Sequence, residues 1–155
     1  MCKPPVCLVN LSPLFRAKNE QTRTGVQPKM KALIIREPWI GRILAGVKTW
    51  EMRTRATSIR GRIGLIRQGT GMVVGVANLV DSLPPLDTKA LAASRDRHGI
   101  TPERDSEAIK GRWLHPWVLR DVRALLRPVP AGQKPGQVIW VALPHTAIAA
   151  INGQV

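Results

Sequence analysis

The chain has 155 residues, 44% of them hydrophobic and 22% charged, which excludes wholesale disorder and leaves room for one domain with a hydrophobic core. It carries 24 Lys and Arg residues against 10 Asp and Glu, a formal net charge of +14 that favours polyanionic partners, nucleic acid first and acidic membrane surfaces second. No apolar run approaches the ~20 residues that a membrane-spanning helix needs, so a membrane protein is excluded.

Residues 1–29 are expected to form a loose N-terminal arm, because they mix polar residues and prolines without a sustained period of 2 or 3.6. The arm lacks the continuous apolar segment of a secretory signal. Its two cysteines, Cys2 and Cys7, have no second pair to complete a zinc site. We therefore expect reduced thiols in a cytoplasmic protein, and Met30 offers an alternative natural start.

From Lys31 the pattern predicts a strand over residues 31–36 and then a short helix. Pro38 stands where a helix begins and Gly46 where it ends. Apolar residues follow a helical spacing, which predicts one buried face; these are Trp39, Ile40, Ile43 and Leu44.

Three segments rich in Val, Ile, Leu or Trp come next and predict strands of an antiparallel sheet; they cover residues 49–53, 61–67 and 72–81. After a turn, residues 87–99 predict a helix with Asp87 or Thr88 as its N-cap and Gly99 past its end. Residues 100–111 are expected to be a polar excursion, and the mixed charges of RDRHGITPERD indicate a solvated turn.

Two strands close the predicted domain, at residues 117–126 and 137–143, with a loop at residues 128–136 between them. About six short strands with a helix after the first indicate an α+β fold, a small closed or nearly closed β-barrel with flanking helices. The folded domain is expected over residues 30–144, with residues 145–155 as a C-terminal tail.

The stretch ALIIREPWIGRILAGVKTWEMRTR resembles the opening of the ASCH (activating-signal-cointegrator homology) domain, a relative of the PUA domains. The family's G-x-K-x-x-E-x-R motif follows a Pro-Trp pair and is filled by Gly46, Lys48, Glu51 and Arg53. HPWVLRDVRALLRPVPAGQKPGQVIWVAL is similar to the family's closing strands. The resemblance covers roughly residues 30–144 and implies a PUA-like β-barrel whose motif residues stand at a cleft.

The resemblance also implies a class of ligand, because ASCH proteins are thought to bind RNA or nucleotides. Some members resemble ribonucleases, or amidohydrolases that act on acetylated cytidine. The amidohydrolases carry Thr where Glu51 stands here and a Glu where this chain reads RDRHG, so only Lys48 matches and that activity is disfavoured. The expected partner is RNA or a nucleotide, with no cofactor and no metal; His98 and His115 lack ligand spacing.

On a strand beginning near Thr49, period 2 places Trp50 and Met52 on one face and Glu51 and Arg53 on the other. Cations on the polar face bind phosphate oxygens, while a carboxylate accepts from an exocyclic amine. The same groups suit metal-free phosphodiester cleavage, with Glu51 as general base and Lys48 or Arg53 stabilising the transition state.

Three hypotheses therefore stand. The leading one is RNA or nucleotide binding in a basic cleft by Arg36, Trp39, Lys48, Glu51, Arg53 and Trp117. The alternative is a metal-independent ribonuclease or nucleoside hydrolase whose catalytic residues are Lys48 and Glu51. The third is a protein-interaction module in which the cleft is vestigial. Taken without the family resemblance, Glu51 and Arg53 would form an ordinary surface salt bridge. In every case Trp39 also suits a core anchor, and Trp113 and Trp140 are assigned to the core.

Overall fold

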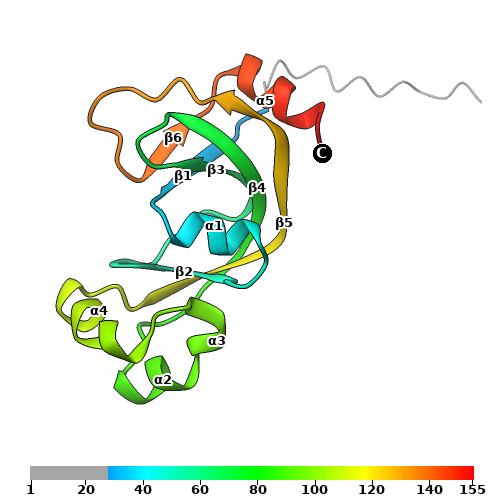
Figure 1. Ribbon diagram of the computed structural model, residues 1–155. Coiled ribbons are helices and arrows are strands. Elements are labelled where there is room, and N and C mark those ends of the chain that lie inside the picture. Colours follow the sequence, from blue (N-terminus) through cyan, green and yellow to red (C-terminus); the bar gives the residue numbers. More distant parts are fainter. Residues whose placement is uncertain (1–27) are drawn as a thin grey trace, which may run out of the picture.

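The computed structural model describes residues 28–155, so Cys2, Cys7 and nearly all of the predicted arm of residues 1–29 lie outside the described residues. The elements, drawn in Figure 1, follow in the order β1 (Lys31–Ile35), α1 (Trp39–Leu44), β2 (Trp50–Arg53), β3 (Gly61–Arg67), β4 (Met72–Ser82), α2 (Thr88–Ala93), α3 (Arg95–His98), the 3₁₀ turn η1 (Pro102–Arg104), α4 (Asp105–Gly111), β5 (His115–Pro130), β6 (Trp140–Ala142) and α5 (His145–Asn152).

The strands form one six-stranded sheet in the order β2-β5-β4-β3-β1-β6. Every neighbouring pair is antiparallel except β1 and β3, which run parallel because α1 and β2 lie in the connection between them. The edge strands are therefore β2 and β6. The sheet as a whole curls strongly (Figure 1). The predicted α+β class with six strands and flanking helices is confirmed.

Helix α1 packs inside the curl of the sheet. Its buried Ile40 and Ile43 join a core cluster with Leu65 of β3 and Leu79 of β4. A glycine is required at position 75, because a Cβ there would lie 2.9 Å from the backbone carbonyl oxygen of Arg123 in β5 and 2.5 Å from the side chain of Leu44 in α1. The helix therefore sits directly against the sheet, which fixes the turn that leads from it into β2.

The region between β4 and β5 is more ordered than the sequence pattern indicates. The predicted helix of residues 87–99 is capped by Asp87 but is divided at Ser94 into α2 and α3. The prediction of a solvated turn at RDRHGITPERD is wrong. Arg95 forms two hydrogen bonds to the carboxylate of Asp105, at 2.8 and 2.6 Å, and they hold α3 against α4.

Residues 145–155, which the sequence predicts to be a C-terminal tail, include helix α5. This helix lies at the opposite end of the sheet from α2, α3 and α4 (Figure 1). Its buried residues, Ala147, Ile148 and Ile151, fall at helical spacing and pack on the sheet. Strand β5 is also longer than predicted, because Val129 is buried and pairs with Val73 of β4 in what the sequence marks as a loop.

Candidate functional site

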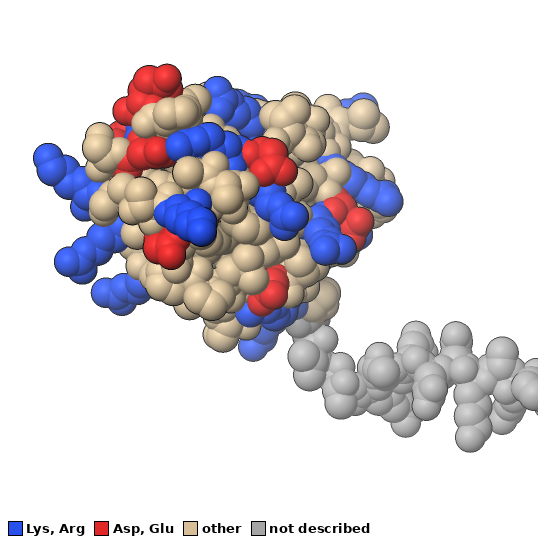
Figure 2. All heavy atoms as spheres, turned by 90° about the horizontal axis from the view of Figure 1, so that it is seen from below, with Lys and Arg blue, Asp and Glu red and all other residues tan. Residues whose placement is uncertain are grey.

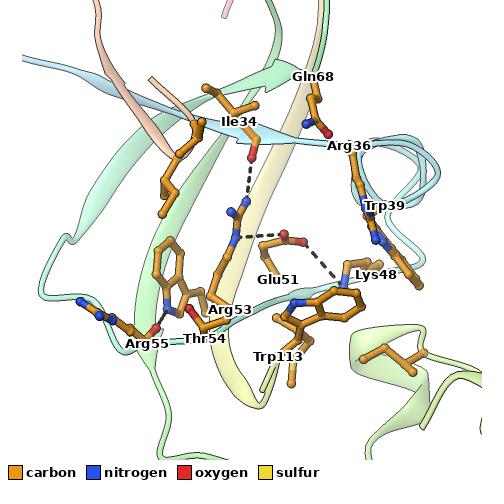
Figure 3. Close-up of a pocket in the computed structure, with 15 residues that line it drawn as sticks. Ile34, Arg36, Trp39, Lys48, Glu51, Arg53, Thr54, Arg55, Gln68 and Trp113 are labelled. Carbon is orange, nitrogen blue, oxygen red and sulfur yellow. Dashed lines mark hydrogen bonds and ion pairs between the residues drawn. The ribbon is translucent and has the colours of Figure 1, made fainter. Parts of the chain in front are cut away.

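A pocket of about 570 Å³ lies at the seam, our name for the gap between the edge strands β2 (Trp50–Arg53) and β6 (Trp140–Ala142). One wall comes from β2 and another from Ile34 of β1 and from Ile139, just before β6. All six residues predicted to bind a ligand line this pocket; they are Arg36, Trp39, Lys48, Glu51, Arg53 and Trp117 (Figure 3).

Strand β2 places its side chains as the period of 2 predicts. Trp50 and Met52 join one core cluster, while Glu51 and Arg53 share the opposite face. Arg53 Nε lies 3.2 Å from Glu51 Oε1. Glu51 is only 6% exposed and the Arg53 side chain is partly buried, so the pair lies in the pocket wall and is not the surface salt bridge of the alternative interpretation.

Lys48 is fixed by backbone carbonyl groups. Its Nζ donates to the carbonyl oxygens of Trp50 at 2.5 Å and His98 at 2.7 Å, and lies 3.8 Å from Glu51 Oε2. Burial lowers the pKa of Lys48 to about 8, although the nearby Glu51 carboxylate acts to raise it. The amine is therefore a cation near neutral pH with little freedom to move.

His98 carries the carbonyl that holds Lys48, a role the sequence did not reveal. Its imidazole is buried, with Nε2 donating to Leu91 O at 2.7 Å and Nδ1 accepting from the amide of Ile100 at 2.9 Å. This pair of bonds requires the neutral ring, and burial lowers its pKa. The available sequence signal was Gly99, whose left-handed φ of 71° turns the chain after α3.

Arg53 spans the seam. Its Nη2 donates to the carbonyl oxygen of Ile34 in β1 at 2.7 Å, and its guanidinium lies 5.6 Å from the ring centre of Trp117. Trp117 in turn stacks on Trp140 of β6, with ring centres 5.6 Å apart and planes 13° from parallel. Trp117, which lines the pocket, thus links β5 to β6 through its stack on Trp140.

The remaining tryptophans at the pocket have different surroundings. Trp39 has three cations over its ring at 5.0 to 5.4 Å, from Arg42, Lys48 and Arg104. Its ring is therefore engaged by the protein itself. Trp113, assigned to the core by its sequence context, is only half-buried and lines the pocket beneath the guanidinium of Arg36 at 5.4 Å.

Sequence reasoning missed several further lining residues, because they come from loops and strand ends far apart in the chain. They are Thr54, Arg55, Gln68, Ile100, Trp113, Val138 and Ile139. Only Thr54 and Arg55 stand next to the recognised motif. In Figure 3 the Glu51 carboxylate lies between Arg53 and Lys48, with Trp113 on one side and Arg36 and Gln68 toward the rim.

Positive charge is spread over the surface. Figure 2 shows Lys and Arg side chains at many points of the face that carries α2, α3 and α4, with Asp and Glu side chains among them. Within residues 28–155, no group of three or more His, Cys, Asp or Glu residues is placed to hold a metal ion. None of the helices in the described part is long and apolar enough to cross a membrane.

Comparison with known proteins assigns this architecture to a family. The model of the ASCH domain matches residues 33–126. The crystal structure of ASCH from Zymomonas mobilis is similar, with 17% sequence identity and a TM-score of 0.63, over 80% of this chain and 94% of that one.

Two further crystal structures are mutants of the Zymomonas mobilis protein. A Ser-to-Ala mutant matches with 18% identity and a TM-score of 0.63, over 83% of this chain and 99% of that one. A Tyr-to-Phe mutant matches with 18% identity and a TM-score of 0.59, over 81% and 98%. At such identities the likeness establishes the fold alone. No curated protein matches the sequence.

Proposed function

This chain belongs to the ASCH domain family, and on that premise we propose that it binds single-stranded RNA or a nucleotide in the pocket at the seam. The ligand's phosphate lies near Arg36 and Arg55 at the rim, and its base enters toward Glu51 and the indole rings.

The observation that carries the proposal is the group formed by the buried Lys48 and Glu51 and the partly buried Arg53 on the wall of a pocket rather than inside a sealed core. Burying these charges costs stability, and apolar residues of similar size would avoid that cost. The presence of these charged side chains around an open cavity of ligand size, beside flat aromatic rings, supports a binding role. The net charge of +14 supports an anionic ligand.

The test is the affinity for a fluorescently labelled single-stranded RNA, measured by anisotropy in EDTA over a range of salt concentrations. Binding that weakens with salt is expected, because phosphate contacts release counterions. Lys48→Ala should lower the affinity severalfold, whereas Lys110→Ala, which removes an exposed lysine outside the pocket, should not. An affinity that responds equally to both variants would refute the proposed site.

A second candidate function, metal-independent cleavage of RNA, is favoured by one observation. The Lys48 amine, a cation near neutral pH, lies 3.8 Å from the Glu51 carboxylate on the pocket wall, so a general base and a group that stabilises negative charge stand side by side. Cleavage in EDTA that disappears in Glu51→Gln would support this function. RNA that is shifted on a gel but remains intact would leave the binding function alone.

A further inference from the structure

The Glu51 carboxylate has acceptor capacity that the protein does not use. Within residues 28–155 neither of its oxygens receives a hydrogen bond: Lys48 Nζ and Arg53 Nε are at ion-pair distances of 3.8 and 3.2 Å. Arg53 Nε is buried and has no hydrogen-bond partner. Its contact with Glu51 is therefore an ion pair without a hydrogen bond. Neither oxygen is among the fully buried side-chain atoms that lack a partner in the described residues, so both are open to a donor that enters the pocket.

The two cations are anchored elsewhere. Lys48 donates to the carbonyl oxygens of Trp50 and His98, and Arg53 donates to that of Ile34. They therefore lie close to Glu51 but do not occupy its oxygens with directed bonds. The carboxylate is left as a fixed acceptor on the pocket wall (Figure 3).

Flat groups border this acceptor. The indole of Trp113 lies under the guanidinium of Arg36, and the indole of Trp117, which stacks on Trp140, lies beside the guanidinium of Arg53. Aromatic rings and guanidinium planes are the surfaces on which proteins stack unpaired bases. A base held on these surfaces would present its edge to Glu51.

We infer that the pocket selects guanine, with Glu51 accepting from the ring N1–H and the exocyclic amino group together; this inference rests on the proposed function. A carboxylate offers two acceptors and no donor. Among the neutral RNA bases only guanine carries two adjacent donors on its Watson–Crick edge. Adenine and cytosine place a ring acceptor beside their amino group, and uracil has one N–H between two carbonyl oxygens.

Two further polar atoms of guanine have donors available at the pocket. Its O6 and N7 atoms are acceptors. The side-chain amide of Gln68 forms no hydrogen bond in the described part of the chain and lines the same pocket as Arg36. Gln68 and Arg36 both carry N–H donors at the rim. A bound guanine would therefore meet the Glu51 acceptor at one end of its edge and these donors at the other.

The experiment compares short uridine oligomers that carry one central guanine, hypoxanthine, adenine or cytosine, with all-uridine RNA as reference. Binding is followed by tryptophan fluorescence, because the chain has five Trp and no Tyr. Guanine should bind roughly tenfold or more tightly than adenine, cytosine or uracil. Hypoxanthine keeps N1–H but lacks the amino group, so its oligomer should bind with intermediate affinity.

Glu51→Gln should abolish the preference for guanine, since an amide replaces one acceptor by a donor. Glu103→Gln removes an exposed carboxylate outside the pocket and should retain the preference. Thermal unfolding verifies that both variants fold, and the comparison of guanine with hypoxanthine needs no variant. Equal affinity for all the oligomers overturns the guanine inference but keeps the proposed function, whereas binding of none overturns both.

Discussion

The end of the molecule that carries α5 and the end that carries the pocket bury different chemistry. Between α5 and the sheet the buried cluster is entirely aliphatic and includes Val73, Val141 and Ile151. At the pocket end lie Lys48, Glu51 and His98, which are all of the buried polar or charged side chains within residues 28–155. Burial of apolar side chains at the α5 end stabilises the fold. This stabilisation offsets the cost of burying charged groups at the pocket end.

The largest expected effect comes from disturbing the aliphatic end. Ile151 is fully buried, so Ile151→Ala should lower the free energy of unfolding by about 2–5 kcal/mol through lost apolar contact and a residual cavity. Urea unfolding at neutral pH measures this loss. Affinity for RNA should not change under conditions where the variant is folded, because the pocket lies at the other end.

The matched control at the same end is Leu126, which is 89% exposed. Leu126→Ala should change the free energy of unfolding by no more than about 0.5 kcal/mol. The comparison of the two ends breaks down if Ile151→Ala costs no more than this control, or if it weakens RNA binding while the protein stays folded.

The next effect should come from Lys48 in alkaline solution. Its pKa is about 8 in the folded protein and about 10.4 when unfolded, so the unfolded chain binds more protons between these values. The free energy of unfolding should therefore rise with pH across this window, by up to about 3 kcal/mol in total. Urea unfolding of wild type and Lys48→Met should diverge there; parallel pH profiles would show that Lys48 is not buried as described.

A smaller effect is expected on the acid side, from His98. Because its pKa is lowered in the folded protein, the unfolded chain takes up the proton first as the pH falls below about 6.5, and stability drops. The thermal midpoint should fall less steeply between about pH 7 and 5 in His98→Gln. His145→Gln, at an exposed histidine of α5, should keep the wild-type slope; a reduced slope there would contradict the assignment.

The smallest effect should come from the rim of the pocket. Arg36→Ala removes an exposed cation over Trp113 and should weaken RNA binding roughly threefold, with a shallower dependence of affinity on salt. Arg120→Ala, at an exposed arginine of β5 away from the pocket, should leave both quantities close to wild type. If Arg120→Ala has the larger effect, RNA contacts another face.

The sequence predicted what depends on local periodicity and missed what depends on contacts between distant segments. Alternation along β2 placed Glu51 and Arg53 on one face, and the motif led to Lys48. The carbonyl of His98, which fixes Lys48, is 50 residues away and belongs to a polar run that resembles a solvated loop. Trp113 follows a polar helix, and nothing local indicates that the fold turns it toward Arg36. Helix α5 has no side-chain cap, no acidic residue in its first turn and no basic residue in its last, so its sequence lacks the usual signals of a helix start and end.

The seam has a mechanical consequence. The edges of β2 and β6 do not pair with each other, and Arg53 makes one of the few links across the opening, to the carbonyl of Ile34. A ligand in the pocket would touch both sides at once and tie the open sheet into a closed ring. Backbone amides of both edge strands, including those that no ligand atom reaches, should then exchange with deuterium more slowly when the pocket is filled.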